Sequence, residues 1–179
     1  MKVLAFAASN SRQSINKQLL TYAAAVLHSE AQKDVVVEIL DLNDFEMPIY
    51  SIDRENQDGI PPLAHSFFNQ IGAADALLIA YAEHNGSYSV AFKNIFDWAS
   101  RIQAKVFQDK PTVLLSTSPG ARGGARVLKL ALEAAPHFAA DVKGSISIPS
   151  FNAVFDAQTQ SLSDPEWAEK LRIVVMKLV

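Results

Sequence analysis

Five short apolar runs, separated by segments with helical spacing, constrain most strongly what this chain can fold into. The runs lie at Val3–Ala8, Val35–Leu40, Ala76–Ala80, Thr112–Ser116 and Val142–Ile148. Within each run the apolar residues follow one another almost without interruption, which is typical of strands buried on both faces of a parallel sheet. The alternation of such strands with helices predicts an α/β protein.

The segments between the runs place apolar residues on one face of a helix. The last helix is expected to begin near Asp164-Pro165, because proline suits a first turn. The polar stretch 41–62 predicts a long loop with at most one helical turn. We therefore expect one domain over residues 1–179, with a flavodoxin-like, five-stranded, doubly wound parallel sheet and helices on both faces. The shared helical faces are Ile15, Leu19, Tyr22, Ala23, Val26 and Leu27, then Ala91, Ile95, Trp98 and Ile102, then Val127, Leu128, Ala131 and Leu132 before Pro136.

The composition excludes several classes of function. The chain has no cysteine, which excludes disulfides, thiolate nucleophiles and cysteine-ligated metal sites. Its 16 basic and 19 acidic residues give a net charge of -3, unlike the cationic surface of a nucleic-acid-binding protein. No apolar run approaches the roughly 20 residues that cross a bilayer. We expect a cytoplasmic protein that acts on small molecules, with no nucleic-acid or membrane partner and no metal.

The first of three polar loops follows the first run and opens the first helix. It reads Ser9-Asn10-Ser11-Arg12-Gln13-Ser14-Ile15-Asn16. A helix N-terminus offers unpaired N–H groups and a partial positive charge, and the serine hydroxyls and Arg12 add donors for a phosphate dianion. The alternative is a polar turn in which Ser14 only caps the helix. The glycine patterns that bind pyrophosphates and triphosphates are absent, which favours a monophosphate such as that of FMN.

The second loop, Ala82–Ser89, follows the third run. Its Asn85-Gly86 pair predicts a turn with positive φ, which exposes backbone amides to a flat heteroaromatic ring. His84 is a candidate proton donor, because histidine titrates near neutral pH. The alternative is an ordinary turn before a helix that Ser87 caps.

The third loop follows the fourth run and carries three glycines within five positions. It reads Ser116-Thr117-Ser118-Pro119-Gly120-Ala121-Arg122-Gly123-Gly124. Glycine lets the backbone approach a ligand closely, although a flexible turn would have the same composition. Because ligands bind beyond the carboxyl ends of the strands in an open α/β sheet, the three loops together predict one site.

At these loops, and over nearly the whole chain, the sequence resembles the NADPH-dependent FMN reductase family. The family's phosphate loop, G-S-x-R-x-x-S-x-N, is matched except that Ala8 replaces the glycine and Ser11 the arginine, with Arg12 one position later. Its second motif, P-E-Y-N-G-S, is matched except at Ala82 and His84. The third motif, S-x-S-P-G-x-x-G-G, is complete in the third loop.

The resemblance implies bound FMN, NADPH or NADH as a transient electron donor, and a small acceptor such as a flavin, quinone, chromate, azo or nitro compound. It implies no catalytic side chain, because the flavin carries the chemistry. It also implies a homodimer or homotetramer. Exposed apolar residues such as Tyr88 and Phe92 are candidates for such an interface, although core packing explains them equally well. The predicted cofactor-binding residues are Ser9, Ser11, Arg12, Ser14, Ile15, Asn16, Ala82, Glu83, His84, Asn85, Gly86, Ser116, Pro119, Gly120, Gly123 and Gly124.

Two other functions remain open at this point. A flavodoxin-type electron carrier would bind FMN without reacting with nicotinamide, but it normally has a T-x-T-G-x-T phosphate loop and a strongly acidic surface. A flavin-free regulatory domain would keep the fold and lose the cofactor, as the replacements at Ala8, Ser11, Ala82 and His84 would allow. Bound flavin in the purified protein separates this last alternative from the others.

Overall fold

The computed structural model describes residues 1–31 and 34–179 and contains one five-stranded sheet and a two-stranded ribbon. The sheet strands are β1 (Lys2–Ala8), β2 (Val36–Leu40), β3 (Ala76–Tyr81), β4 (Lys110–Thr117) and β5 (Ala140–Ile148). The ribbon joins β6 (Phe155–Asp156) and β7 (Ser161–Leu162). The helices are α1 (Ile15–Glu30), α2 (Ile52–Asp58), α3 (Pro62–Gly72), α4 (Val90–Ile102), α5 (Ala125–Ala134), α6 (Phe151–Val154) and α7 (Pro165–Val175). Short 3-10 helices are η1 (Leu42–Phe45), η2 (Ala135–Phe138) and η3 (Met176–Leu178).

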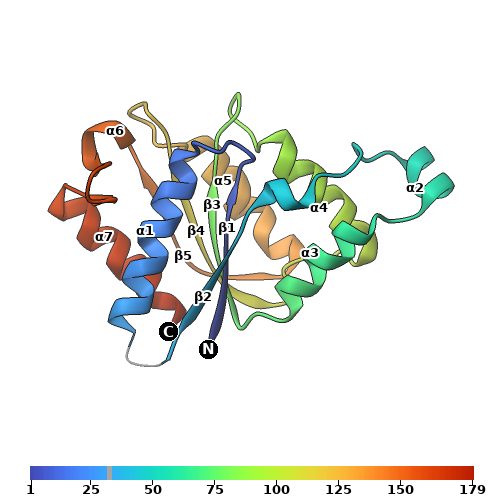
Figure 1. Cartoon of the computed structure of the whole chain (residues 1–179), viewed down its shortest axis with the longest axis horizontal. Helices are drawn as coiled ribbons and strands as arrows, with labels where there is room; N and C mark the ends of the chain where they lie inside the picture. Colours follow the sequence, from blue (N-terminus) through green and yellow to red (C-terminus); the bar gives the residue numbers. More distant parts are fainter. Residues whose placement is uncertain (32–33) are drawn as a thin grey trace.

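The five strands pair in parallel in the order β2-β1-β3-β4-β5 (Figure 1). The chain starts near the middle of the sheet and winds outward in both directions, so the predicted flavodoxin-like, doubly wound fold is confirmed. In this order, the strand connections diverge between β1 and β3, and the carboxyl ends of these strands form the usual ligand crevice. The predicted strands agree with the observed ones to within two residues at each end.

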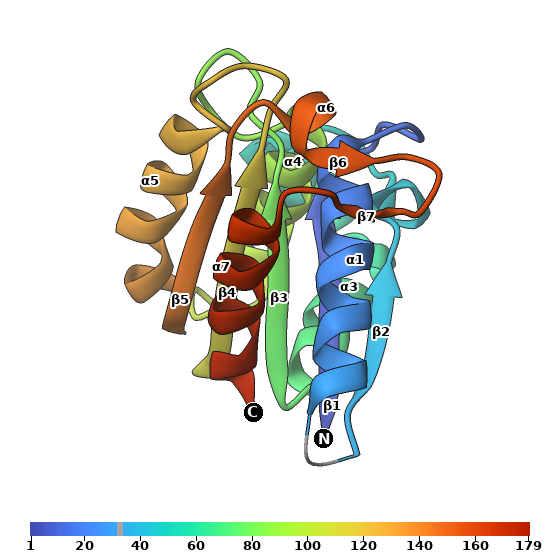
Figure 2. The same cartoon turned by 90° about the vertical axis from the view of Figure 1, so that its left-hand side faces the viewer.

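Each face of the sheet has its own hydrophobic core. Helices α1 and α7 cover one face, where alternate residues of β1 and β3 such as Ala5 and Leu78 are fully buried (Figure 2). Helices α3, α4 and α5 cover the other face, where Phe6 and Ile79 point. A parallel strand buried on both sides must be apolar at every position, and β3 is buried throughout. Each fully buried large side chain contributes about 1.5–3 kcal/mol.

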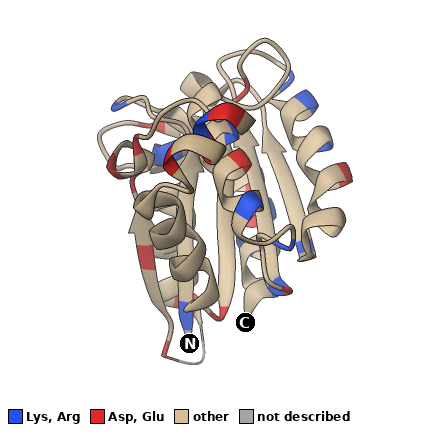
Figure 3. Cartoon of the chain, turned by 90° about the vertical axis from the view of Figure 1, so that its right-hand side faces the viewer, with Lys and Arg blue, Asp and Glu red and all other residues tan. Residues whose placement is uncertain are grey.

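Most charged residues lie on helices, in loops and at strand ends, and the two edge strands also carry Glu38 in β2 and Lys143 in β5 (Figure 3). The interiors of β1, β3 and β4 carry none, because their side chains enter the two cores. In the described part of the chain, no helix combines the length and the apolarity that a membrane crossing requires.

The segment 41–62 contains more helix than the predicted loop with at most one turn. It forms η1 and the seven-residue α2, which stands out from the body of the molecule (Figure 1). The Ser51 hydroxyl caps α2 by accepting a hydrogen bond from Arg54 N, and Gly59 ends the helix with φ +76°. The prediction was wrong because α2 buries no residue and therefore has no apolar periodicity.

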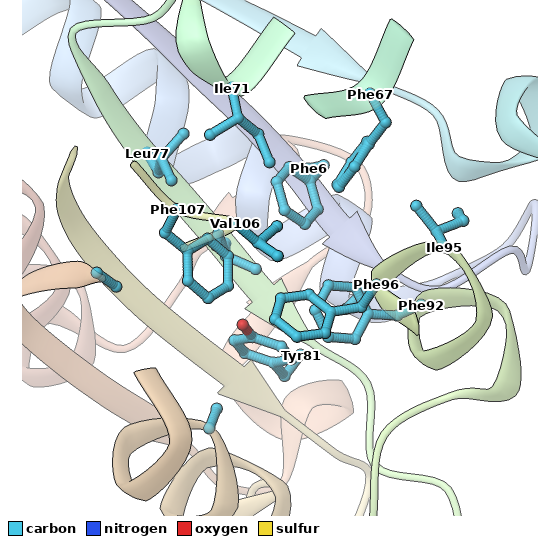
Figure 4. Close-up of a cluster of buried hydrophobic side chains, with 14 of the residues drawn as sticks. Phe6, Phe67, Ile71, Leu77, Tyr81, Phe92, Ile95, Phe96, Val106 and Phe107 are labelled. Atoms are coloured by element: carbon cyan, nitrogen blue, oxygen red, sulfur yellow. The ribbon is translucent and has the colours of Figure 1, made fainter. Parts of the chain in front are cut away.

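The buried face of α4 is also offset from the predicted one. Phe92, predicted as a candidate exposed contact, is 2% exposed and stacks on Phe6 at 6.3 Å between ring centroids. Tyr88 is partly buried and packs against the same core. Figure 4 shows the aromatic cluster that Phe92 joins. Core packing, the alternative given for Phe92, is therefore confirmed, and the expected exposure of this side chain was wrong. The residues of α4 that are buried are Phe92, Ile95, Phe96, Trp98 and Ala99.

Candidate functional site

Three polar loops meet at the carboxyl ends of β1, β3 and β4, which are neighbours in the sheet (Figures 1 and 2). We name them loop 1 (Ser9–Ser14), loop 2 (Ala82–Ser89) and loop 3 (Ser118–Gly124). Their contacts with one another and with the strand ends define the site.

Loop 1 presents a cluster of hydrogen-bond donors at the start of α1. The Ser14 hydroxyl accepts from Lys17 N at 3.3 Å, so the predicted helix cap is confirmed. The Ser9 hydroxyl accepts from Ser11 N at 3.2 Å. Among the described residues, no hydrogen bond is found for the N–H groups of Arg12, Gln13, Ile15 or Asn16. These N–H groups and the serine hydroxyls are donors of the kind that binds an oxyanion at a helix N-terminus.

Arg12 is the cation that loop 1 itself supplies. Its side chain is exposed and makes no ion pair with any residue in the described ranges. Lys17, one turn into α1, is instead held by the Asp41 carboxylate at 2.5 Å. The hydrogen bond from Lys17 lowers the pKa of Asp41 to about 2, so this pair is charged at neutral pH. Arg12 therefore remains available to an anion.

Asn16 ties the start of α1 to the end of β4. Its side-chain amide donates to Thr117 O at 3.1 Å and accepts from Thr117 N at 2.9 Å. Asn16 is 3% exposed and Thr117 is 1% exposed. Both polar atoms of the Asn16 side chain are engaged with the backbone, which leaves the Asn16 N–H as its free donor. The predicted role of Asn16 in cofactor binding stays a prediction.

Loop 2 is a tight hairpin that projects beyond β3. His84 and Ser87 exchange two backbone hydrogen bonds, at 2.9 and 3.0 Å. Asn85 and Gly86 have φ values of 53° and 79°, which confirms the predicted turn with positive φ. His84 is exposed at this tip.

Ser89, rather than Ser87, caps α4. The Ser89 hydroxyl accepts from Phe92 N at 3.2 Å and donates to Ala8 O, the last carbonyl of β1, at 2.8 Å. The alternative expectation that Ser87 caps the helix was wrong, because the hairpin uses the backbone of Ser87. Ser89 precedes the first residue of α4, and this position was the signal that could have identified it.

Glu83 joins loop 2 to the helix that follows loop 3. Its Oε2 atom accepts from Arg126 N at 3.1 Å and from Val127 N at 3.2 Å, in the first turn of α5. The residue that precedes α5 is Gly124, which has no side chain to cap the helix. The Glu83 carboxylate therefore satisfies these two donors and faces the positive end of the helix dipole.

We expect Glu83→Ala to lower the free energy of unfolding by about 1–2 kcal/mol, because α5 loses its only side-chain cap and a favourable charge at its N-terminus. Urea denaturation monitored by circular dichroism measures this loss. The matched control is Glu133→Ala, since Glu133 is exposed near the C-terminal end of the same helix. Equal stabilities of the two variants would contradict the capping role.

Loop 3 is held in place by hydrogen bonds to its backbone. Gly123 O accepts from the hydroxyls of Ser116 at 2.9 Å and Ser147 at 3.0 Å. Gly120 O accepts from Ser150 N at 3.0 Å, so the loop also contacts the segment after β5. Gly123 and Gly124 both have positive φ. The turn thus requires glycine at these two positions, whereas Gly120 has an ordinary φ.

The predicted site residues fall into two groups. Those of the first group lie in the loops or at the start of α1, and of these Ser9, Ser14, Ala82, Gly123 and Gly124 are buried while the others are partly or fully exposed. In the second group, Asn16, Glu83 and Ser116 use their side chains to fasten the loops. Thr117 and Ser89 were not predicted, although both connect neighbouring strand ends. The first group comprises Ser9, Ser11, Arg12, Ser14, Ile15, Ala82, His84, Asn85, Gly86, Pro119, Gly120, Gly123 and Gly124.

A cavity of about 270 Å³ opens beside loops 1 and 2, mostly between α4 and the segment 42–49 that includes η1. Asn10 and His84 line it from the two loops, and Asn94 lines it from α4. Its apolar wall includes Met47 and Val90. A cavity with apolar walls and a few polar groups suits a flat organic ring. No cluster of three or more His, Asp or Glu side chains that could hold a metal ion is found in residues 1–31 and 34–179.

Comparisons with known proteins agree with this geometry. The model of the NADPH-dependent FMN reductase family matches residues 1–153. An NADPH:quinone oxidoreductase of Arabidopsis thaliana is 35% identical over 69% of this chain and 61% of its own length. An NAD(P)H-dependent FMN reductase of Pseudomonas aeruginosa is 34% identical over 92% of this chain and 86% of that protein.

The solved structures extend the agreement to the fold. FerB of Paracoccus denitrificans, a flavoenzyme NAD(P)H:(acceptor) oxidoreductase, superposes with a TM-score of 0.76 at 23% identity, covering 99% of this chain and 94% of that one. The crystal structure of the azoreductase AzrA superposes with a TM-score of 0.69 at 18% identity, covering 99% of this chain and 96% of that one. With the family match over residues 1–153 and the three loops at the strand ends, the chain belongs to the NADPH-dependent FMN reductase family.

Proposed function

We propose that this chain binds FMN and passes electrons from NADPH or NADH through it to a small acceptor. The observation that carries the proposal is loop 1, where N–H groups without a protein partner, serine hydroxyls and the exposed Arg12 lie together at the N-terminus of α1. A helix N-terminus with these donors and one arginine suits a single phosphate group. Loop 1 contains no glycine-rich pattern of the kind that binds a pyrophosphate. FMN supplies hydride acceptance and onward electron transfer when it is bound.

The remaining loops are proposed to hold the flavin ring. Amides of the Asn85-Gly86 turn and of loop 3 can donate to the polar edge of the ring, and the absence of a side chain at the exposed Gly120 leaves room for a flat face. Nicotinamide and acceptor would then use the same open face in turn. The cavity beside His84 is the proposed place of approach, and its mixed lining favours a quinone or another flat ring.

The proposal is tested by the visible spectrum of the purified protein after addition of FMN and desalting, followed without oxygen on addition of NADPH and then NADH. We expect a protein-bound flavin band that bleaches. Bound flavin that does not bleach would indicate an electron carrier, and no bound flavin would indicate a regulatory domain. With a quinone as acceptor, parallel double-reciprocal lines would support alternating use of one site, whereas intersecting lines without competition would contradict it.

We expect Arg12→Gln to weaken FMN binding about tenfold, because a charge-assisted contact with the phosphate dianion is lost. The stability of the FMN-free protein should stay within about 0.5 kcal/mol of the parent, since Arg12 is exposed. Fluorescence titration of FMN at two salt concentrations measures the effect. Lys105→Gln is the matched control, because Lys105 is exposed in the turn before β4, away from the loops. Unchanged affinity in Arg12→Gln would place the phosphate elsewhere.

We also propose that the chain acts as a single domain in the cytoplasm and assembles as a homodimer or homotetramer. Ile49 and Val90 are 66% and 70% exposed and both line the cavity beside loop 2, so a second copy could cover them next to the flavin. Light scattering of the FMN-saturated protein measures the assembly. A monomer mass would contradict this part of the proposal without affecting flavin binding.

A further inference from the structure

A second cavity lies between α4 and α5, on the face of the sheet that carries the aromatic cluster. Its volume is about 120 Å³. It shares no lining residue with the cavity beside His84. The lining residues are Tyr81, Tyr88, Phe92, Lys93, Phe96, Asp97, Ser100, Phe107, Ala131, Ala134, Ala135 and Phe138.

Aromatic rings form most of the wall of this cavity. The rings of Phe96 and Phe138 meet edge to face with centroids 4.7 Å apart, and Phe96 lies 5.4 Å from Phe107. Tyr81 and Tyr88 are 5.5 Å apart. On the side of the cavity that α5 forms, the lining residues are small, as at Ala131, so they leave space beside the aromatic rings. An apolar cavity of about 150 Å³ binds benzene. At about 120 Å³, and open on one side to solvent, this space approaches the size needed for one six-membered ring.

The Tyr81 hydroxyl gives the cavity a specific polar group. Tyr81 is 2% exposed, yet its hydroxyl makes no hydrogen bond with any residue that the structure describes. The hydroxyl is not sealed within protein atoms, since no sealed side-chain oxygen in the described part of the chain lacks a partner. In Figure 4 the hydroxyl oxygen points away from Phe92, toward the side of Phe107. Burial raises the pKa of Tyr81 and raises that of Tyr88 to about 12, so both remain donors at neutral pH.

The charges at the rim favour a neutral ligand. Lys93 and Asp97 pair with each other at 2.7 Å, one turn apart on α4. The Ser100 hydroxyl donates to Asp97 O at 2.8 Å. The rim therefore offers no unpaired charge for an ionic ligand, while the interior offers aromatic walls and a hydroxyl donor.

We propose that this cavity is a second binding site, separate from the flavin site, for a small neutral aromatic molecule with one hydrogen-bond acceptor, such as a phenol. The ring would pack among Phe96, Phe107 and Phe138, and the Tyr81 O–H would donate to its oxygen. A hydroxyl that reaches an apolar cavity and has no protein partner favours a ligand that can pair with it, because an unmatched polar group in an apolar site is unfavourable. This site does not depend on the proposed reaction.

The test is a titration of the full chain with phenol, with and without saturating FMN, followed by ¹H–¹⁵N NMR. We expect saturable shifts at Tyr81, Phe96 and Ala131 in both states. Tyr81→Phe keeps the ring and removes the donor, so phenol should bind about two- to tenfold more weakly. Ala134→Leu fills the cavity from α5 and should weaken binding at least about tenfold. Benzene, which has no strong acceptor, should bind Tyr81→Phe and the parent equally.

Tyr22→Phe is the matched control, because Tyr22 lies on the other face of the sheet against Phe155. Phenol should bind this variant as it binds the parent. Shifts confined to loops 1 to 3, or binding that neither Tyr81→Phe nor Ala134→Leu weakens, would overturn the proposal. The absence of saturable binding in the parent chain would do so as well. Because the titration is also run without FMN, its failure is distinguishable from a failure to bind flavin.

Discussion

Gly123→Ala is expected to lower the free energy of unfolding by about 3 kcal/mol, which is one of two strong effects that follow from the loop contacts. An alanine with φ near +58° is strained by about 1–2 kcal/mol. Its Cβ atom would lie 2.7 Å from the carbonyl carbon and oxygen of Ile148 and 2.6 Å from Ser147 Oγ. Crowding against backbone atoms cannot be relieved by a side-chain rotation, which adds a further 1–3 kcal/mol or so.

The same substitution is expected to weaken FMN binding more than about tenfold. Loop 3 must move away from the end of β5 to make room for the methyl group, so the hydrogen bonds of Ser116 and Ser147 to Gly123 O are strained. A shift of about 1 Å in a positioning loop is enough for an effect of this size. Urea denaturation of the FMN-free protein and a separate FMN titration measure the two effects.

Alanine substitutions at two other glycines distinguish the cost of backbone strain from the cost of steric crowding. Gly86→Ala also has positive φ, but its Cβ atom would meet only Arg126 side-chain atoms at 3.6 Å, so we expect a loss of about 1 kcal/mol. Gly120→Ala has neither problem and should unfold within about 0.5 kcal/mol of the parent. If Gly123→Ala is no less stable than Gly86→Ala, the close approach of loop 3 to Ile148 is not a constraint on the folded chain.

The sheet could be predicted from sequence because its strands are buried on both faces. Both faces of such a strand are apolar, so it appears in the sequence as an uninterrupted apolar run. The runs Val3–Ala8 and Ala76–Ala80 are examples, and the observed β1 and β3 include them. Helix α2 could not be predicted in this way, since its stability comes from the Ser51 cap and local charges rather than from a buried stripe. Phe92 was misplaced because the exact angle of α4 against the sheet is a tertiary property.

The sequence predicted where the site lies, but not which contacts hold it together. Its location follows from the topology, because the three loops come after strands that are neighbours in the sheet. The sequence could not reveal that Glu83 caps α5, more than 40 residues later, or that Asn16 engages Thr117 across 101 positions. Family patterns mark such residues without distinguishing a ligand contact from a contact that fastens a loop.

Asn16→Ala makes this distinction, and we expect it to lower the free energy of unfolding by about 2–4 kcal/mol. The variant leaves both the N–H and the C=O of Thr117 without their side-chain partner at a residue that is 1% exposed. Each unsatisfied buried group costs about 1–3 kcal/mol. Asn69→Ala, at an exposed position of α3, is the control and should be near neutral.

The pattern of losses in Asn16→Ala identifies what its side chain does. If the Asn16 side chain fastens loop 1 to β4, the FMN-free protein becomes less stable. The affinity for FMN then falls as well, because the hydrogen-bond donors of loop 1 are no longer held in position. If the amide instead contacts the cofactor, FMN affinity falls while the FMN-free protein unfolds at the parental urea concentration. Urea denaturation with and without excess FMN separates the cases, since a ligand stabilises only the state that binds it. The two buried hydrogen bonds to Thr117 favour the first result.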